Sequence, residues 1–340
     1  MQLSSTFTKS PAPTIDLPLS SPLSYIRDQR MFKGRDLLRV SDLSALEIEL
    51  ILKVSALLKS HQLDSAQSLL AKGKTSVMLF EKPSLRTRVA FETGMSQLGG
   101  TSVFMHGPIG GVHLNDARES TKDIASNLNC WVDVIVARTF SQKTIEELAA
   151  YADIPVINAL SDLEHPCQSL ADLQTLQEHK GQLKGLKIAF VGDGTNVANS
   201  LMLCAAKLGL NFTLACPPGY ESPAEIVATA KAAALESGAI INITNDPHEA
   251  VINADAIYTD SWASMGLESE AEIRRPIFTP YQVNKKLLEN ASPEVIVMHC
   301  LPAHRGEEIT DEVLDGPHSV VLDQATNRLH TQKALLSLIL

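Results

Sequence analysis

From residue 31 to the end of the chain, short apolar runs rich in Val and Ile alternate with longer segments of helical pattern. In the first half, the predicted strands are 76–80, 101–105, 131–138 and 154–158. The predicted helices between them are 85–98, 119–129 and 144–152. Short β-branched strands that alternate with helices favour parallel sheets covered on both faces. The sequence therefore predicts a doubly wound α/β fold.

A second series follows the predicted helix 166–180, which ends near Gly181 and Gly185. The predicted strands of this series are 186–191, 211–216, 239–243, 256–259 and 295–299. Two series joined by one helix predict two doubly wound parallel-sheet domains with an inter-domain active-site cleft. We expect one domain at 31–165, closed by the C-terminal helix 324–340, and a second at 166–323.

Two capping-box patterns, Ser44 to Glu47 and Thr144 to Glu147, predict the starts of helices. In each, the hydroxyl and the carboxylate three residues later can satisfy each other's backbone N–H groups. The first of these helices is expected to run to about His61.

The chain has 340 residues, a formal net charge of −10 and 44% hydrophobic residues, which is typical of a soluble globular protein. The acidic balance argues against nucleic-acid binding, so a local basic cluster indicates a small-anion site. The five cysteines show no CxxC pair and no metal-ligand spacing, and they indicate reduced thiols of a cytoplasmic protein. No apolar run approaches the ~18 residues needed to span a membrane.

The first 30 residues are rich in Ser and Pro and lack the periodicity of the rest. No apolar segment precedes a small-residue cleavage site, which argues against a secretory signal. Asp16, Asp28 and the scarcity of Arg argue against a transit peptide. We expect residues 1–30 to be a flexible extension, or Met31 to be the true start.

The stretch SLRTR, which follows the first predicted strand, places Arg86 and Arg88 in the first turn of a helix. Two cations are unfavourable there, because a helix N-terminus carries partial positive charge. A phosphate would reverse this, held by backbone N–H groups, by the hydroxyl groups of Ser84 and Thr87 and by the guanidinium groups of Arg86 and Arg88. The alternative is that the two arginines only pair with Glu81 and Glu92.

Other polar residues also follow strands of the first half. Arg138 ends one strand, and His165 and Gln168 of the HPCQ motif follow another and open a helix. The His and Gln side chains can donate to carbonyl or phosphate oxygens. A lone His before Pro is more often a capping or core residue, so this motif alone is a weak signal.

In the second half, VGDGTNVANS partly matches a dinucleotide-binding pattern through Gly192 and Gly194. Val197 stands in place of the third glycine, and the next strand ends without a ribose-binding acid. Asn196 would obstruct a pyrophosphate. These differences argue against nicotinamide binding.

Asp260 and Cys300 each lie at the end of a predicted strand. A carboxylate there could bind an ammonium group. Cys300 would act as a nucleophile if His299 or His304 served as its base. The alternative is a thiol that only lines the pocket.

Six motifs occur in one order along the chain: FEKPSLRTR, HPCQSLADLQT, VGDGTNVANS, DSWASMG, HCLPAHRGEE and NRLHTQKA. From Met31 onward they resemble the ornithine carbamoyltransferases of the aspartate/ornithine carbamoyltransferase superfamily. SxRTR and HPxQ are typical of carbamoyltransferases in general, whereas DxxxSMG with HCLP is specific for ornithine. The resemblance implies transfer of the carbamoyl group of carbamoyl phosphate to the δ-amine of L-ornithine, giving citrulline and phosphate, with neither cofactor nor metal.

The resemblance also implies roles for the two domains and for single residues. Domain 31–165 would bind carbamoyl phosphate and domain 166–323 would bind ornithine. The implied carbamoyl phosphate ligands are Ser84, Leu85, Arg86, Thr87, Arg138, His165, Gln168, Cys300, Leu301 and Arg328. The implied ornithine ligands are Asn196, Asp260, Ser264 and Met265. The implied catalytic residues are Arg86, Arg138, His165 and Cys300.

In this family a loop of a neighbouring subunit completes the phosphate site, and His113 matches that loop. This implies a homotrimer with active sites shared at subunit interfaces. Two positions depart from the family pattern. Leu85 replaces the usual Thr or Met, and the loop after His113 is one residue longer before Glu119. The extra residue changes the spacing between His113 and Glu119, on which the match of His113 to the family loop depends.

Two other functions fit part of the pattern. A relative that acts on putrescine or an N-acylated ornithine is disfavoured by Asp260 with the SMG sequence, which indicates a free amino acid. A non-catalytic binding protein is disfavoured because Arg86, Arg138, His165 and Cys300 are all present.

Overall fold

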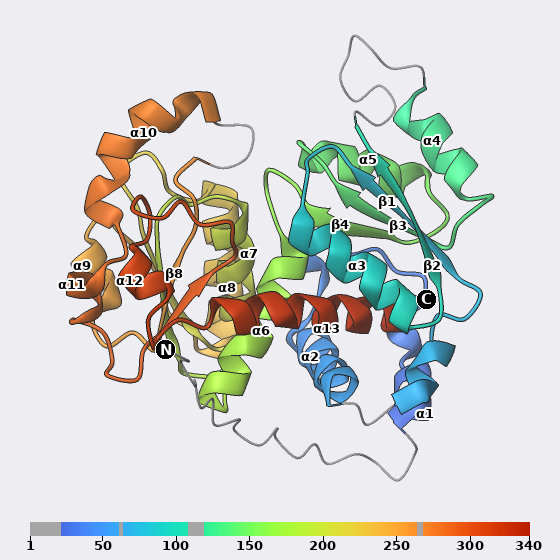
Figure 1. Ribbon diagram of the computed structural model, residues 1–340, viewed down its shortest axis with the longest axis horizontal. Coiled ribbons are helices and arrows are strands. Elements are labelled where there is room, and N and C mark those ends of the chain that lie inside the picture. The colour runs from blue at the N-terminus through green and yellow to red at the C-terminus, as the bar shows by residue number, and fades with distance from the viewer. Residues whose placement is uncertain (1–21, 61–63, 108–118, 264–267) are drawn as a thin grey trace, which may run out of the picture.

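The structure is a computed structural model that describes residues 22–60, 64–107, 119–263 and 268–340. Figure 1 shows two lobes side by side, each built on one sheet. Every pair of neighbouring strands is parallel. This confirms the predicted class of two doubly wound α/β domains.

The first lobe contains helices α1 (Pro22–Arg27), α2 (Ala45–Lys59), α3 (Leu85–Gln97), α4 (Thr121–Leu128) and α5 (Gln142–Tyr151). Its strands are β1 (Thr75–Phe80), β2 (Thr101–His106), β3 (Val134–Arg138) and β4 (Val156–Leu160). Short 3-10 helices lie at Arg30–Phe32, Val40–Asp42 and Asp64–Leu69.

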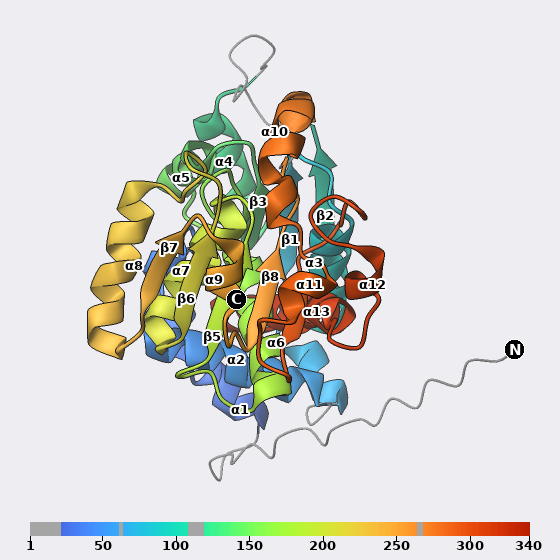
Figure 2. The same ribbon diagram turned by 90° about the vertical axis from the view of Figure 1, so that its left-hand side faces the viewer.

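The second lobe contains strands β5 (Lys187–Val191), β6 (Asn211–Ala215), β7 (Ile241–Thr244), β8 (Ala256–Thr259) and β9 (Ile296–His299). Its helices are α7 (Asn196–Leu208), α8 (Ala224–Ser237), α9 (Pro247–Val251), α10 (Ala271–Phe278), α11 (Lys285–Leu288) and α12 (Asp311–Leu314). Short 3-10 helices lie at Glu268–Glu270 and Thr279–Tyr281. Figure 2 brings this lobe to the front, with α8 on its outer side.

Each sheet has one point where the order of its strands reverses. The first sheet has the order β2-β1-β3-β4, and the second has the order β7-β6-β5-β8-β9. The reversals therefore lie between β1 and β3 and between β5 and β8. Ligands of open parallel sheets bind beyond the carboxyl ends of strands at such points. The topology thus directs attention to the residues that follow these four strands.

Two long helices connect the lobes. Helix α6 (Pro166–Lys180) links the two series of strands, as predicted, and α13 (Val321–Ile339) returns from the second lobe. Helix α13 packs against α2, α3 and α6 and crosses the molecule horizontally in Figure 1, from the second lobe to the first. Side chains of α6 and α13 therefore lie between the two sheets and can reach both.

The predicted helix starts have different outcomes. The Ser44 Oγ accepts from the Glu47 N–H at 3.2 Å and the Glu47 carboxylate accepts from the Ser44 N–H at 2.7 Å, which confirms the first capping box. The second prediction is wrong. Helix α5 begins two residues before Thr144, because Ser141 serves as its N-cap. Polar hydroxyls at two nearby positions made either start compatible with the sequence.

Several predicted boundaries also shift by a few residues. Strand β3 begins at Val134 rather than 131, and β4 covers 156–160 rather than 154–158. Helix α13 begins at Val321, ahead of the predicted 324. Strand β3 still ends at Arg138, which confirms the predicted position of this residue at the end of a strand.

Part of the predicted flexible extension is packed. Residues 22–27 form α1, in which Ile26 is only 2% exposed. The Lys53 ammonium lies over the Tyr25 ring, 5.0 Å from its centroid. The prediction was therefore wrong for this stretch, while residues 1–21 lie outside the described part of the chain.

Among the described residues, every helix is too short or too polar to cross a bilayer.

Candidate active site

Helix α3 begins directly beyond β1 with the predicted anion-binding sequence. Ser84 is its N-cap, and the Ser84 hydroxyl accepts from the Thr87 N–H at 3.2 Å. Leu85 is the first residue of the helix, so its backbone N–H has no partner within the helix, and the residue is 72% exposed. Free N–H groups of a first helical turn favour an anion.

Three arginines converge on this helix start from separate elements. Arg86 belongs to α3, Arg138 ends β3, and Arg328 lies on α13. Burial lowers the pKa of all three, and the positive charges of Arg328 and Arg86 lower the pKa of Arg138 further, to about 9. Such crowding of buried positive charge is costly unless an anion enters. The group is therefore arranged for a multiply charged anion.

His165 is the N-cap of α6 and is followed by Pro166 at the first helical position. Burial holds the pKa of His165 well below its usual value, and the three neighbouring arginines lower it further. The imidazole is therefore neutral at pH 7. Its Nδ1 is buried without a hydrogen-bond partner among the described residues. A neutral imidazole beside an anion site can donate one N–H to a substrate oxygen.

A hydrogen-bonded chain joins the helix start to α6. The Arg328 guanidinium donates to the Thr87 Oγ1 at 2.9 Å and to the Gln168 Oε1 at 2.5 Å. All three side chains are buried. The sequence placed these residues in one site, and the structure brings them into direct contact.

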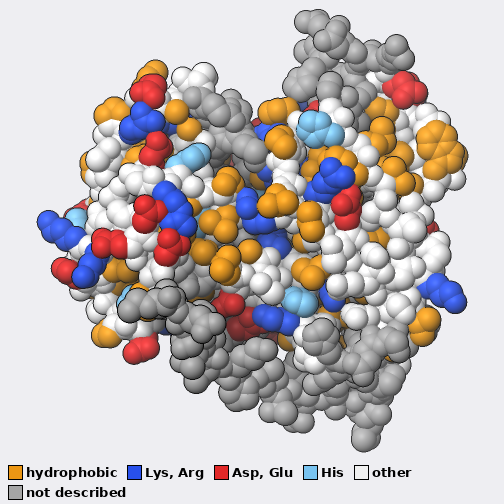
Figure 3. All heavy atoms as spheres, in the orientation of Figure 1, with side chains coloured by type: hydrophobic (Ala, Val, Ile, Leu, Met, Phe, Trp, Pro, Cys, Tyr) orange, Lys and Arg blue, Asp and Glu red, His pale blue; other side chains and the backbone are white. Residues whose placement is uncertain are grey.

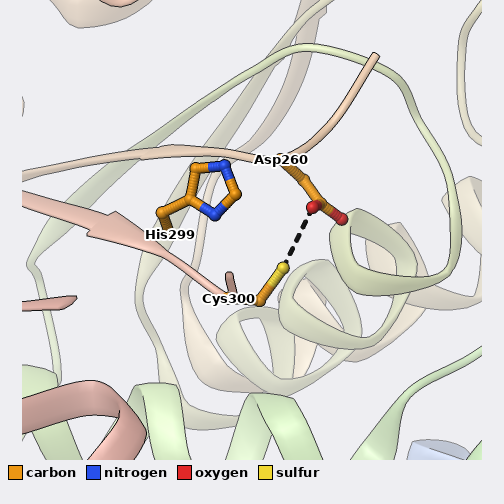
Figure 4. A group of neighbouring side chains, drawn as sticks. All are labelled: Asp260, His299 and Cys300. Atoms are coloured by element: carbon orange, nitrogen blue, oxygen red, sulfur yellow. Dashed lines mark hydrogen bonds between the residues drawn. The ribbon is translucent and has the colours of Figure 1, made fainter. Parts of the chain in front are cut away.

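Across from this cluster, the Cys300 thiol donates to the Asp260 Oδ1 at 3.0 Å (Figure 4). Burial and the Asp260 carboxylate raise the pKa of Cys300 well above its usual value, so the thiol stays protonated. The neighbouring His299 ring is bonded elsewhere, to the Leu301 N–H at 2.8 Å and to Glu308 at 3.1 Å. A thiolate nucleophile paired with His299 is therefore not formed, and the other predicted base, His304, lies 3.7 Å from the Glu308 carboxylate.

The two lobes meet through Arg86 and Leu301. The Arg86 guanidinium donates to the Leu301 carbonyl oxygen, and Leu301 has the left-handed φ of 57° that is unusual for this residue type. Arg86 therefore does not pair with Glu81, whose Oε2 accepts from the Phe140 N–H at 2.8 Å. The alternative of simple ion pairing is wrong for Arg86.

Arg88, by contrast, is engaged with Glu92 of its own helix and with Phe104 of β2. It pairs with Glu92 at 3.1 Å, and its guanidinium lies 3.6 Å from the centroid of the Phe104 ring. The ion-pair alternative is therefore confirmed for Arg88, whereas Arg86 contacts the Leu301 carbonyl oxygen instead.

Not every predicted ligand can be placed. Asn196 begins α7 and donates to the Ser161 carbonyl at 2.6 Å, which ties the second lobe to the end of β4. His113, Ser264 and Met265 lie outside the described residues.

The glycines after β5 have structural reasons of their own. A Cβ on Gly194 would lie 2.3 Å from the Ser222 backbone nitrogen, and Gly192 has a positive φ of 149°. The close approach of the backbone therefore explains the glycine at 194, and the backbone conformation explains the glycine at 192. Neither explanation involves a bound dinucleotide.

Two groups of side chains among the described residues could hold a metal ion. Ligand atoms of Asp260, His299 and Cys300 lie within 4.8 Å of one another, and the same is true of His304, Glu307 and Glu308. In the first group both ring nitrogens of His299 already make hydrogen bonds. In the second group Glu307 pairs with Arg275 at 3.0 Å, and Glu308 accepts from His299 at 3.1 Å. A metal ion would have to displace some of these contacts.

Sequence reasoning missed a buried ion pair beside the site. Arg274 of α10 bonds the Asp193 carboxylate at 2.5 Å and the Trp262 carbonyl at 3.0 Å. Burial raises the pKa of Asp193 to about 6 although Arg274 opposes this. The pair fixes the start of α10 against the loop after β5. Because 81 residues separate the partners, no local pattern could reveal it.

The space-filling view shows basic side chains gathered in the hollow between the lobes (Figure 3). The segments that follow β1 and β9 meet between the lobes, because the Arg86 guanidinium donates to the Leu301 carbonyl oxygen. The site therefore combines a positive, anion-binding wall with a wall that carries a carboxylate and a thiol.

Comparisons with known proteins agree with this architecture. A family model described as the carbamoyl-P binding domain of aspartate/ornithine carbamoyltransferase matches residues 35–178. A second, described as the Asp/Orn binding domain, matches residues 184–339. The chain belongs to the aspartate/ornithine carbamoyltransferase family.

Among its relatives is a protein of Pyrococcus furiosus named "Ornithine carbamoyltransferase, anabolic", which is 50% identical over 307 residues, 90% of this chain and 96% of the relative. A solved ornithine carbamoyltransferase from the same organism has a TM-score of 0.86 at 50% identity and covers 91% of this chain and 97% of its own. A solved N-acetyl-L-ornithine transcarbamylase is 31% identical, with a TM-score of 0.81 and coverage of 90% and 100%.

Proposed function

We propose that this protein transfers the carbamoyl group of carbamoyl phosphate to the δ-amine of L-ornithine, giving citrulline and phosphate. The observation that carries the proposal is that a positively charged side of the site faces a side that carries a carboxylate and a thiol. Arg86, Arg138 and Arg328 surround a helix N-terminus, and the Asp260–Cys300 pair faces them. The high identity to proteins named ornithine carbamoyltransferase supports the same reaction.

The first wall suits the donor substrate. The phosphate would bind the N–H groups and the hydroxyls at the start of α3, with Arg86 as its main counter-charge. Arg138 and the neutral His165 would then donate to the carbonyl oxygen, on which negative charge develops during attack. The proposed ligands of carbamoyl phosphate are Ser84, Leu85, Arg86, Thr87, His113, Arg138, His165, Gln168, Cys300, Leu301 and Arg328.

The second wall suits the acceptor. The amine of ornithine must be neutral to attack, and its unperturbed pKa is close to the ~10.4 of lysine. Asp260 and Cys300 would position this amine and receive hydrogen bonds from it. Asn196, Ser264 and Met265 are proposed to hold the amino acid end. Juxtaposition of two held substrates would supply much of the acceleration.

The division of labour follows the two sheets. We assign carbamoyl phosphate binding to 31–165 with the closing helix, and ornithine binding to 166–323. The buried contacts of Arg328 with Thr87 and Gln168 support placing the C-terminal helix with the donor site.

A homotrimer with shared active sites is part of the proposal. Strand β2 is an edge strand, and its Val103 and Met105 are 48% and 50% exposed. Leu85 and Val89 are exposed next to it and line an open depression of about 580 Å³ together with Ser84. An apolar edge strand beside the anion site suits burial by a second copy that also contacts this site. Light scattering should give three copies of the 36.8 kDa chain.

The reaction would serve arginine biosynthesis in the cytoplasm. The direction rests on the relative named as anabolic, and the compartment rests on the reduced cysteines. Thiols buried as in Cys167 and Cys204 are typical of a reducing compartment.

Initial rates with carbamoyl phosphate and three acceptors test the substrate assignment. L-Ornithine should be carbamoylated at least about 100-fold faster than putrescine or N-acetyl-L-ornithine, because a site built for polar groups rejects analogues that leave them unpaired. Preference for N-acetyl-L-ornithine would overturn it.

A further inference from the structure

A buried carboxyl group lies at the meeting point of the two half-sites. Asp172 sits on α6, one turn after Gln168, and is 0% exposed. Its Oδ1 accepts from the Gln168 Nε2 at 2.8 Å and from the Gln324 Nε2 at 2.7 Å. Its Oδ2 is buried without a hydrogen-bond partner among the described residues. One oxygen atom therefore binds both amide groups.

Each amide group leads on to one half of the site. The Gln168 Oε1 accepts from Arg328 at 2.5 Å, and Arg328 donates in turn to Thr87 at 2.9 Å. The Gln324 Oε1 accepts from the His299 backbone N–H at 2.9 Å, one residue before Cys300. A continuous chain of hydrogen bonds thus runs from Thr87, at the start of α3, through Asp172 to the end of β9.

The chain has a direction that depends on the carboxyl group. A carboxamide has one accepting oxygen and one donating NH2 group. Because Asp172 binds both NH2 groups, both oxygens must face outward, toward Arg328 and toward the His299 N–H. Without an acceptor at position 172, the buried Gln168 NH2 group would lose its hydrogen-bond partner, and the Gln324 NH2 group would keep only the Tyr258 hydroxyl, at 2.9 Å. An amide group held on one side only is less firmly oriented, and an unpaired donor is unfavourable in a buried site.

We propose that Asp172 is a positioning residue. By fixing the amide groups of Gln168 and Gln324, it holds the carbamoyl phosphate site and the ornithine site in their relative positions. The inference rests on the proposed function. The required property is the acceptor at Oδ1, which persists whether or not the free Oδ2 carries a proton. Among the described residues, Gln168 is the one proposed substrate ligand to which the Asp172 side chain is hydrogen-bonded, so Asp172 acts through its neighbours.

Two substitutions at this position separate the acceptor from the charge. Asp172→Asn keeps an acceptor oxygen and removes the charge. Asp172→Leu removes both the acceptor oxygen and the charge but keeps a side chain of similar size. Gln174→Leu is the matched control, because Gln174 is equally buried on the same helix but bonds Ser55 and Glu178 instead. For each protein, kcat, both KM values, the Kd for inorganic phosphate and the melting temperature are measured.

Asp172→Leu should lower kcat/KM for carbamoyl phosphate by about 10- to 100-fold, because small misplacements of a site have effects of this size. Its Kd for phosphate should rise, and Asp172→Asn should restore both values to within a few-fold of wild type. Gln174→Leu should change only the melting temperature. If Asp172→Leu does not fold, Gln324→Leu, which breaks the link to His299, should show the same loss in kcat.

Two results overturn the inference while leaving the proposed function intact. One is a folded Asp172→Leu protein with wild-type KM values and kcat. The other is an Asp172→Asn protein as impaired as Asp172→Leu, which would mean that the charge matters. A wild-type protein that binds phosphate but forms no citrulline would instead overturn the proposed function.

Discussion

The Arg86 guanidinium donates to the carbonyl oxygen of Leu301, and this contact joins the start of α3 in the first lobe to the loop after β9 in the second. An anion bound at the helix start would compete with that carbonyl for the same guanidinium. Binding of carbamoyl phosphate would thereby free the Leu301 carbonyl, and Leu301 is itself among the proposed ligands of this substrate. This relationship places Arg86 at the centre of the proposed reaction.

Arg86→Ala should nearly abolish turnover, because the variant loses the main counter-charge of the phosphate at a half-buried site. A surface ion pair would account for only about 1 kcal/mol. Steady-state kinetics check this, with Lys74→Ala as the control. Lys74 pairs with Asp133 at 2.7 Å, and both residues lie just before the amino ends of their strands, away from the site. Retention of more than about a tenth of wild-type kcat/KM, a loss of at most ~1.4 kcal/mol, would contradict the assignment.

Cys300→Ser should keep measurable turnover. The thiol donates to Asp260 and stays protonated, so its expected task is to position ornithine rather than to attack. The loss should fall mainly on the KM for ornithine and on the pH profile. Incubation with [¹⁴C]carbamoyl phosphate alone provides a direct check. Label trapped on the wild-type protein but absent from Cys300→Ser would establish a covalent route instead.

Helix α1 should contribute to the stability of the protein, although the sequence indicated a flexible extension there. A chain that begins at Pro22 should have the same melting temperature as the full chain. A chain that begins at Met31 lacks the buried Ile26. Burial of such a side chain contributes about 1.5–3 kcal/mol. The shorter chain should therefore melt a few degrees lower, by differential scanning calorimetry. Equal melting temperatures for the two truncations would show that α1 adds nothing.

Glu164→Gln should change how stability depends on pH. The Glu164 carboxylate accepts from the Val40 N–H at 2.8 Å and from the Ser200 hydroxyl at 3.1 Å, yet burial raises its pKa to about 7. An acid whose pKa is raised by folding binds more protons in the folded state. Wild-type stability is therefore lost as pH rises from about 4.5 to about 7, and Gln has no such loss.

The stability advantage of Glu164→Gln over wild type should thus grow by up to roughly 3 kcal/mol between pH 4.5 and pH 8. Urea denaturation at several pH values measures this difference. An advantage that stays constant across the window would mean that Glu164 ionises normally in the folded protein.

Local patterns accounted for most of the fold. The strand β8 and the helix α6 have the bounds that the sequence predicted, because β-branched residues and a Pro start mark them clearly. The start of α5 was misplaced because Ser141 and Thr144 both qualify as caps. Helix α1 was missed because its 6 residues are too few to show a helical period.

The site was predictable where a residue follows a strand or opens a helix, as Arg138 and Ser84 do. The contacts between distant side chains were not. Asp172 and Gln324 are 152 residues apart, and Arg274 and Asp193 are 81 apart. Only the way α13 and α10 fold back brings these groups together, and no sequence spacing encodes it.

The most direct test of the central claim is ¹³C NMR of a reaction of [¹³C]carbamoyl phosphate with L-ornithine, followed together with phosphate release. The account predicts that the label appears solely in the ureido carbon on the δ-nitrogen of citrulline, with one phosphate released per citrulline. Label on the α-nitrogen, or phosphate release without citrulline, would contradict it.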